Sequence, residues 1–120
     1  MTAEYFAMRV LQLEDEVFVS GQLFERELET AARQGVRTIL NNRPDDEVAG
    51  QPKSADLQQA AEALGMTYVH FPVISGRITA DDVEGFRAVR SDLERPMLVF
   101  CRTGARSMQL WELADSADGV

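Results

Sequence analysis

The chain has 120 residues, enough for a real hydrophobic core, and we expect residues 1–120 to form one domain. It carries 12 Lys and Arg against 20 Asp and Glu, and the net charge of −8 argues against nucleic acid or an anionic membrane as a main partner. The single Cys excludes an internal disulfide and suits a reducing compartment. No apolar run approaches the ~18 residues of a membrane span, and the start does not resemble a signal peptide, so we expect a cytoplasmic protein.

The first third of the chain predicts two strands and a helix. Short apolar runs indicate strands over 8–13 and 17–20, joined by an acidic turn, and residues 1–7 are expected to be loose. A helix of about 12 residues follows Gln22, because apolar residues recur on one of its faces. That face is formed by Leu23, Phe24, Leu28, Ala31 and Ala32. Gly35 ends the helix where a left-handed residue is needed.

After Gly35, strands and helices alternate along the chain. Ser54 is the predicted cap of the second helix, and Thr79 with Asp82 forms a capping box for the third. The predicted elements are, in order, strand 36–41, helix 55–64, strand 66–71, helix 80–93, strand 96–100 and helix 107–114. This alternation predicts an α/β fold with a mainly parallel central sheet flanked by helices, and a ligand site beyond the carboxyl ends of the strands.

The strand 96–100 leads directly into the only Cys of the chain, Cys101, and a helix follows a short loop. Such a strand, loop and helix aim backbone N–H groups and the positive end of the helix dipole at one spot, where they favour a thiolate. Gly104 allows the loop to close, and the fork of Arg106 suits an oxyanion. We therefore predict Cys101 as a nucleophile and Arg106 as an anion ligand, rather than an inert buried thiol. The rest of the predicted anion-binding loop is Arg102, Thr103, Gly104, Ala105 and Ser107.

Two further candidates lie near the ends of other strands. Arg43 could assist Arg106 in binding an anion, or it could pair with Asp45 or Glu47, and the sequence leaves both interpretations open. His70 lies near the carboxyl end of its strand and would be a convenient general base. A lone His on a strand is, however, more often a packed or capping group.

Four aspartates are candidates for a general acid, and the sequence does not choose among them. They are Asp45, Asp46, Asp81 and Asp82. Capping of the third helix explains the last two equally well, because acidic residues suit a first helical turn. The single His and the single Cys are far apart in the chain, so we expect no metal site, and we expect no cofactor.

Several separated motifs resemble one known family, the phosphatase-like domain family of the β-lactamase hydrolase-like proteins. The motifs are 19–22 (VSGQ), 41–47 (NNRPDDE), 51–52 (QP), 70–73 (HFPV) and 101–107 (CRTGARS) with Trp111. The resemblance covers about residues 8–119. It implies a fold similar to the dual-specificity (tyrosine) phosphatases, with Cys101 as nucleophile and Arg106 as anion ligand. Family members usually continue beyond the Trp-bearing helix, so the resemblance implies that their last helical part is missing here.

Two departures bear on the chemistry. Tyrosine phosphatases place five residues between Cys and Arg and usually have a His directly before the Cys. In this chain four residues lie between Cys101 and Arg106, and Phe100 stands directly before Cys101. Four is the spacing common in single-domain rhodaneses, whose loop holds a persulfide. The loop 73–76, where such phosphatases often keep an aspartate, contains no acid. A phosphate ester needs a proton on its leaving oxygen, whereas a thiolate leaves without one.

The leading hypothesis is therefore sulfur transfer through a Cys101 persulfide, from a small anionic sulfur donor to a thiol acceptor. Because some family members are fused to a metallo-β-lactamase-like persulfide-oxidising domain, such a domain is an expected partner. The alternative is hydrolysis of phosphomonoesters through a phosphocysteine, with a phosphorylated substrate and one of the four aspartates as acid. A third reading is a non-catalytic anion-binding or redox-sensing module.

Overall fold

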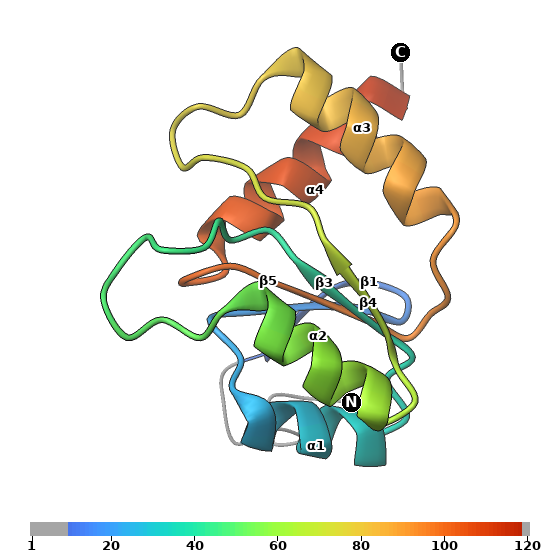
Figure 1. The fold of residues 1–120 in the computed structure, drawn as a ribbon. Coiled ribbons are helices and arrows are strands. Elements are labelled where there is room, and N and C mark those ends of the chain that lie inside the picture. Colours follow the sequence, from blue (N-terminus) through green and yellow to red (C-terminus); the bar gives the residue numbers. More distant parts are fainter. Residues whose placement is uncertain (1–9, 119–120) are drawn as a thin grey trace.

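The computed structural model describes residues 10–118, which form a five-stranded sheet with helices on both faces (Figure 1). The strands are Val10–Glu14 (β1), Val17–Ser20 (β2), Thr38–Asn41 (β3), Thr67–His70 (β4) and Met97–Phe100 (β5). The helices are Glu25–Arg33 (α1), Ser54–Ala63 (α2), Ala80–Ser91 (α3) and Ala105–Asp118 (α4). The strand order is β1-β2-β5-β3-β4, with β1 antiparallel to β2 and the other neighbours parallel. The predicted α/β fold with a mainly parallel sheet is confirmed; the expectation for residues 1–7 lies outside the described residues.

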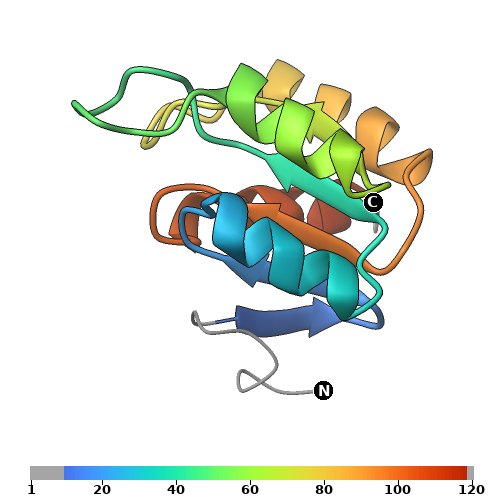
Figure 2. The same ribbon diagram turned by 60° about the horizontal axis from the view of Figure 1, so that its bottom comes forward.

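The central strand β5 divides the hydrophobic core into two layers. Leu98 and Phe100 are buried in the cluster covered by α1 and α2, whereas Met97 and Val99 are buried in the cluster covered by α3 and α4. This alternation follows from the two-residue period of a strand. Figures 1 and 2 show the two helix pairs on opposite faces of the sheet. Residue 101 therefore emerges from the middle of the sheet, at the end of its most buried strand.

Local signals at helix ends were predicted well. The side chain of Thr79 accepts from the N–H of Asp82 at 3.0 Å, and the carboxylate of Asp82 accepts from the N–H of Thr79 at 2.9 Å. Gly35 and Gly65 have φ values of +90° and +85° after α1 and α2. These positions favour Gly because a side chain disfavours positive φ.

Two expectations about helix starts were wrong. The helix α1 is nine residues long and starts after Phe24, whose backbone is extended and whose side chain is 51% exposed. Ser54 is the first residue of α2 rather than its cap. Its N–H donates to the carboxylate of Asp45 at 2.8 Å, and its hydroxyl lies 2.9 Å from the hydroxyl of Tyr68. The carboxylate of Asp45, in the loop before α2, therefore caps this helix in place of the side chain of Ser54.

Candidate active site

The loop after β5 surrounds the sulfur of Cys101. The residue is 1% exposed, and its Sγ accepts from the N–H of Gly104 at 3.1 Å. Gly104 has a φ of +97°, which turns the loop into the first residue of α4, Ala105. A hydrogen bond to sulfur and the N-terminus of a 14-residue helix both favour negative charge there. The predicted strand, loop and helix around Cys101 are thus present.

The guanidinium group of Arg106 is bound on two of its three sides. Nη1 donates to Oε2 of Glu47 at 2.8 Å and to the carbonyl of Val73 at 3.0 Å, and Nη2 donates to Oε1 of Glu47 at 3.1 Å. Nε is buried and has no hydrogen-bond partner in the described part of the chain. Because a guanidinium has five N–H groups, Nε and the second N–H of Nη2 are left on one shared edge. That edge can bind two oxygens of an anion side by side.

Glu47 is a site residue that the sequence indicated only as a possible partner of Arg43. Hydrogen bonding to Arg106 is the largest cause that lowers the pKa of its carboxyl below the usual value. Burial opposes this shift, and the hydrogen bond and charge of Arg43 add to it. The carboxylate is therefore ionised at neutral pH. Its contact with Arg106 joins positions 59 apart in the chain, which no local pattern could predict.

A pocket of about 590 Å³ lies over the cysteine loop. Its lining residues are Glu47, Ser75, Cys101, Arg102, Thr103, Ala105 and Arg106. Most of the predicted anion-binding loop thus faces one space. Ser107 does not: it is fully buried and donates its hydroxyl to the side chain of Asn42 at 2.8 Å, which ties α4 to the end of β3.

Arg43 pairs with Glu47, one of the two alternatives left open by the sequence. It is 3% exposed, its Nε donates to Oε1 of Glu47 at 2.9 Å, and its Nη1 donates to Oε1 of Gln22 at 2.9 Å. The carbonyl oxygen of Arg43 lies 2.7 Å from Nε2 of His70. Because a carbonyl only accepts, Nε2 carries the proton, and His70 holds the backbone of this loop. Neither Arg43 nor His70 lines the pocket.

The four candidate acids are not brought to the thiol. Asp45 accepts from the N–H of Ser54, and Asp82 belongs to the capping box of α3. Asp81 is exposed in the first turn of that helix, and Asp46 is exposed with a φ of +65°. Of the carboxylates in residues 10–118, Glu47 is the one that lines the pocket.

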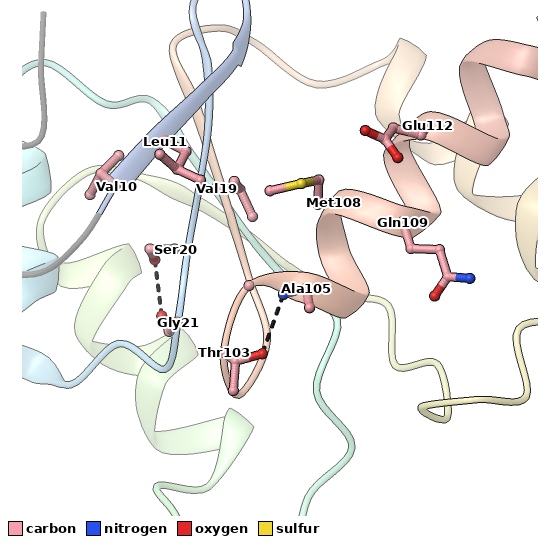
Figure 3. Close-up of a pocket in the computed structure, with 11 residues that line it drawn as sticks. Val10, Leu11, Val19, Ser20, Gly21, Thr103, Ala105, Met108, Gln109 and Glu112 are labelled. Carbon is pink, nitrogen blue, oxygen red and sulfur yellow. Dashed lines mark hydrogen bonds between the residues drawn. The ribbon is translucent and has the colours of Figure 1, made fainter.

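A second pocket of about 550 Å³ lies on the other side of the cysteine loop (Figure 3). It shares Thr103 and Ala105 with the first pocket and is otherwise lined mainly by β1, the end of β2 and the first turns of α4. Within residues 10–118, no group of three or more His, Cys, Asp and Glu could hold a metal ion. No helix in the same range is long and apolar enough to cross a membrane.

A buried thiol in a loop between the central strand and a helix, with an Arg facing the same pocket, defines a cysteine-based, phosphatase-like domain. The fold is similar to that of kinase associated phosphatase, studied with a substitution of its catalytic-site cysteine: the TM-score is 0.63 over 92% of this chain and 76% of that chain, at 15% identity. The fold expected from dual-specificity and tyrosine phosphatases is therefore confirmed.

The chain belongs to the family described as the phosphatase-like domain of the beta-lactamase hydrolase-like protein, whose model matches residues 8–118. It is 36% identical over 112 residues to such a protein from Xylella fastidiosa (strain 9a5c), covering 93% of this chain and 26% of that one. The chain thus spans about a quarter of the length of that relative. A candidate phosphatase from Neisseria meningitidis Z2491 has a TM-score of 0.83 at 39% identity, covering 92% of this chain and 78% of that chain. The resemblance seen in the sequence is confirmed.

Proposed function

We propose that this domain is a cysteine-dependent phosphatase that hydrolyses phosphomonoesters through a phosphocysteine. The observation that supports it most is that Arg106 lines the same pocket as Cys101 and that its buried Nε has no hydrogen-bond partner among residues 10–118, because a guanidinium edge with two parallel N–H groups matches two phosphoryl oxygens. The phosphatase-like family and the likeness to a candidate phosphatase at 39% identity support the same chemistry. They favour it over sulfur transfer, which the sequence alone ranked first.

The first step forms a bond between the Cys101 sulfur and phosphorus while the bond from phosphorus to the ester oxygen breaks. The ester oxygen leaves with the electron pair, and Arg106 stabilises the charge on the phosphoryl oxygens. In the second step a water attacks phosphorus and loses a proton to solvent, and the sulfur–phosphorus bond breaks with its electron pair going to sulfur. Inorganic phosphate is released and the thiolate is regenerated.

Sulfur transfer is the second candidate, and the state of Glu47 favours it. This pocket carboxylate is held ionised by two guanidinium groups, so it does not offer a proton to a leaving oxygen. A sulfur leaving group needs none. The Cys101 thiolate would attack the outer sulfur of an anionic donor, the donor's bond to that sulfur would break, and a thiol acceptor would then take the sulfur. A metallo-β-lactamase-fold, persulfide-oxidising partner belongs to this candidate.

The two candidates are separated by parallel assays on the reduced protein. The proposal predicts hydrolysis of an aryl phosphate that is abolished in Cys101→Ser. It also predicts no thiol-removable gain of one sulfur after exposure to thiosulfate or glutathione persulfide. The reverse pair of results would establish sulfur transfer instead. Loss of both activities with retained phosphate binding would make the domain a non-catalytic anion-binding module.

A further inference from the structure

Four hydrogen bonds connect five residues in series, and the cysteine loop between Arg102 and Arg106 closes the series into a ring. Oε1 of Glu47 accepts from Nε of Arg43 at 2.9 Å and from Nη2 of Arg106 at 3.1 Å, so one oxygen joins two guanidinium groups. Nη1 of Arg43 donates to Oε1 of Gln22 at 2.9 Å. The backbone N–H of Gln22 donates to the carbonyl of Arg102 at 3.1 Å, which returns to the cysteine loop. We call Gln22, Arg43, Glu47, Arg102 and Arg106 the contact ring.

The far side of the contact ring is held rigidly. The backbone N–H of Arg43 donates to Oδ1 of Asn41 at 2.7 Å, and its carbonyl is bound by His70. The side-chain amide of Gln22 donates from Nε2 to the carbonyl of Leu23 at 2.8 Å, so its oxygen faces Arg43. This orientation is the one that a guanidinium requires, because it has donors only. The side chain of Arg43 therefore has a fixed position from which to hold Glu47.

The ring also has a fixed base where β2 ends. A Cβ atom on Gly21 would lie 2.9 Å from the carbonyl oxygen of Arg102, and one on Gly104 would lie 3.3 Å from the carbonyl oxygen of Ser20. The two backbones are thus in direct contact, as the placement of Ser20 and Gly21 beside the loop of Thr103 illustrates (Figure 3). Gln22 directly follows Gly21 in the chain. Because the backbone is held at this contact, the end of β2 gives the side chain of Gln22 a fixed starting point.

We propose that Gln22 and Arg43 are positioning residues for the anion site. They do not line the pocket. They hold the carboxylate of Glu47, and through it the orientation of the free edge of Arg106. A single ionised carboxylate shared by two buried guanidinium groups needs this support, because a loosened partner would leave a buried charge unpaired. The inference rests on the proposed function only in taking Arg106 as the ligand of an oxyanion.

Isothermal titration with inorganic phosphate tests the proposal without turnover. Gln22→Ala, Arg43→Lys and Glu47→Gln should each weaken phosphate binding by roughly 5–30-fold, the effect of losing one charged hydrogen bond. Gln58→Ala is the matched control, because Gln58 is exposed and its side chain donates to Glu62 in the same helix, α2. Phosphate binding by that control should equal that of the parent. Thermal unfolding of every variant shows that it is folded at the temperature of the titration.

The decisive comparison is a double-mutant cycle. Since Gln22 and Arg43 act through Glu47, each double variant with Glu47→Gln should bind phosphate within about twofold of Glu47→Gln alone. Losses that multiply in the double variants, or parent-like binding by both Gln22→Ala and Arg43→Lys, would overturn the proposal. A parent that binds no phosphate overturns it as well. Phosphate binding with this pattern, but without aryl phosphate hydrolysis, would support the positioning role and contradict the proposed reaction.

Discussion

The carboxylate of Glu47 forms a two-bond ion pair with the guanidinium group of Arg106, although the two residues are 59 positions apart in the chain. It joins the loop after β3 to the first turn of α4, the helix that follows β5, and β3 and β5 are neighbours in the sheet. The pair uses the Nη1 and Nη2 end of Arg106, and the buried Nε has no hydrogen-bond partner among residues 10–118. The arginine–carboxylate pair therefore sets which edge of Arg106 would bind the oxyanion in the proposed reaction.

Replacement of Arg106 with Lys should lower kcat/KM for an aryl phosphate by roughly 10²–10³-fold, because a point charge cannot reproduce two parallel N–H donors on a transition-state anion. Steady-state kinetics on the parent and the variant measure the effect. Arg26→Lys is the matched control, since Arg26 is exposed on α1. An Arg106→Lys variant with parent-like kcat/KM would contradict the assignment of Arg106 as the anion ligand.

Glu47→Gln should lower the stability of the protein in a pH-dependent way. The pKa of Glu47 is lowered in the folded state from a usual value of 4.5, mainly by its hydrogen bond with Arg106. The folded state then binds fewer protons, so the stabilisation is present above pH 4.5 and is lost as the pH falls through the folded pKa. Melting temperatures of parent and variant should differ at pH 6 to 7, and the difference should shrink as the pH falls below 4.5. A difference that stays constant as the pH falls below 4.5 would show that ionisation of Glu47 is not the cause.

Tyr68→Phe should destabilise the protein by about 1–2 kcal/mol, because it removes a buried hydroxyl that bonds two partners. That hydroxyl accepts from Nδ2 of Asn41 and lies against the hydroxyl of Ser54, both at 2.9 Å. Burial raises the pKa of Tyr68, so the parent should lose stability as the pH rises above 10, and the variant should not share this loss. Urea unfolding at pH 7 and above pH 10 measures both effects. Equal stability of the two proteins at pH 7 would contradict this role of the hydroxyl.

Hydrolysis of substituted aryl phosphates should slow steeply as the pKa of the leaving phenol rises. The carboxylate that lines the pocket is Glu47, which is held ionised, so the leaving oxygen departs without a proton from that group. A plot of log kcat/KM against the phenol pKa should therefore have a large negative slope. A flat plot would mean that a general acid acts in this site, and it would reopen the assignment of Asp45, Asp46 and Asp81.

The sequence predicted what depends on local chemistry. The position of Cys101 between a buried strand and a helix, the φ of Gly35 and the capping box of Thr79 all follow from short stretches of chain. It failed at Ser54, because the capping carboxylate comes from nine residues earlier in a long loop. Glu47 was seen only as a partner of Arg43, since its contact with Arg106 exists only after β3 and β5 pair.

The ranking of sulfur transfer over phosphate hydrolysis rested on loop spacing and on the missing acid in residues 73–76. The family and its likeness to phosphatases reverse that ranking, although the ionised state of Glu47 agrees with the original argument. Spacing in a short loop describes the size of the space around the thiol. It does not identify the group that the thiol attacks.

The most direct test of the account is to stop aryl phosphate turnover by rapid denaturation and to locate any modification of Cys101 by mass spectrometry of its peptide. The account predicts a phosphoryl group on Cys101 that is absent from Cys101→Ser and disappears when the substrate is exhausted. A peptide that never carries phosphate, but that gains one sulfur after exposure to thiosulfate and loses it to a thiol, would contradict the proposed phosphatase reaction.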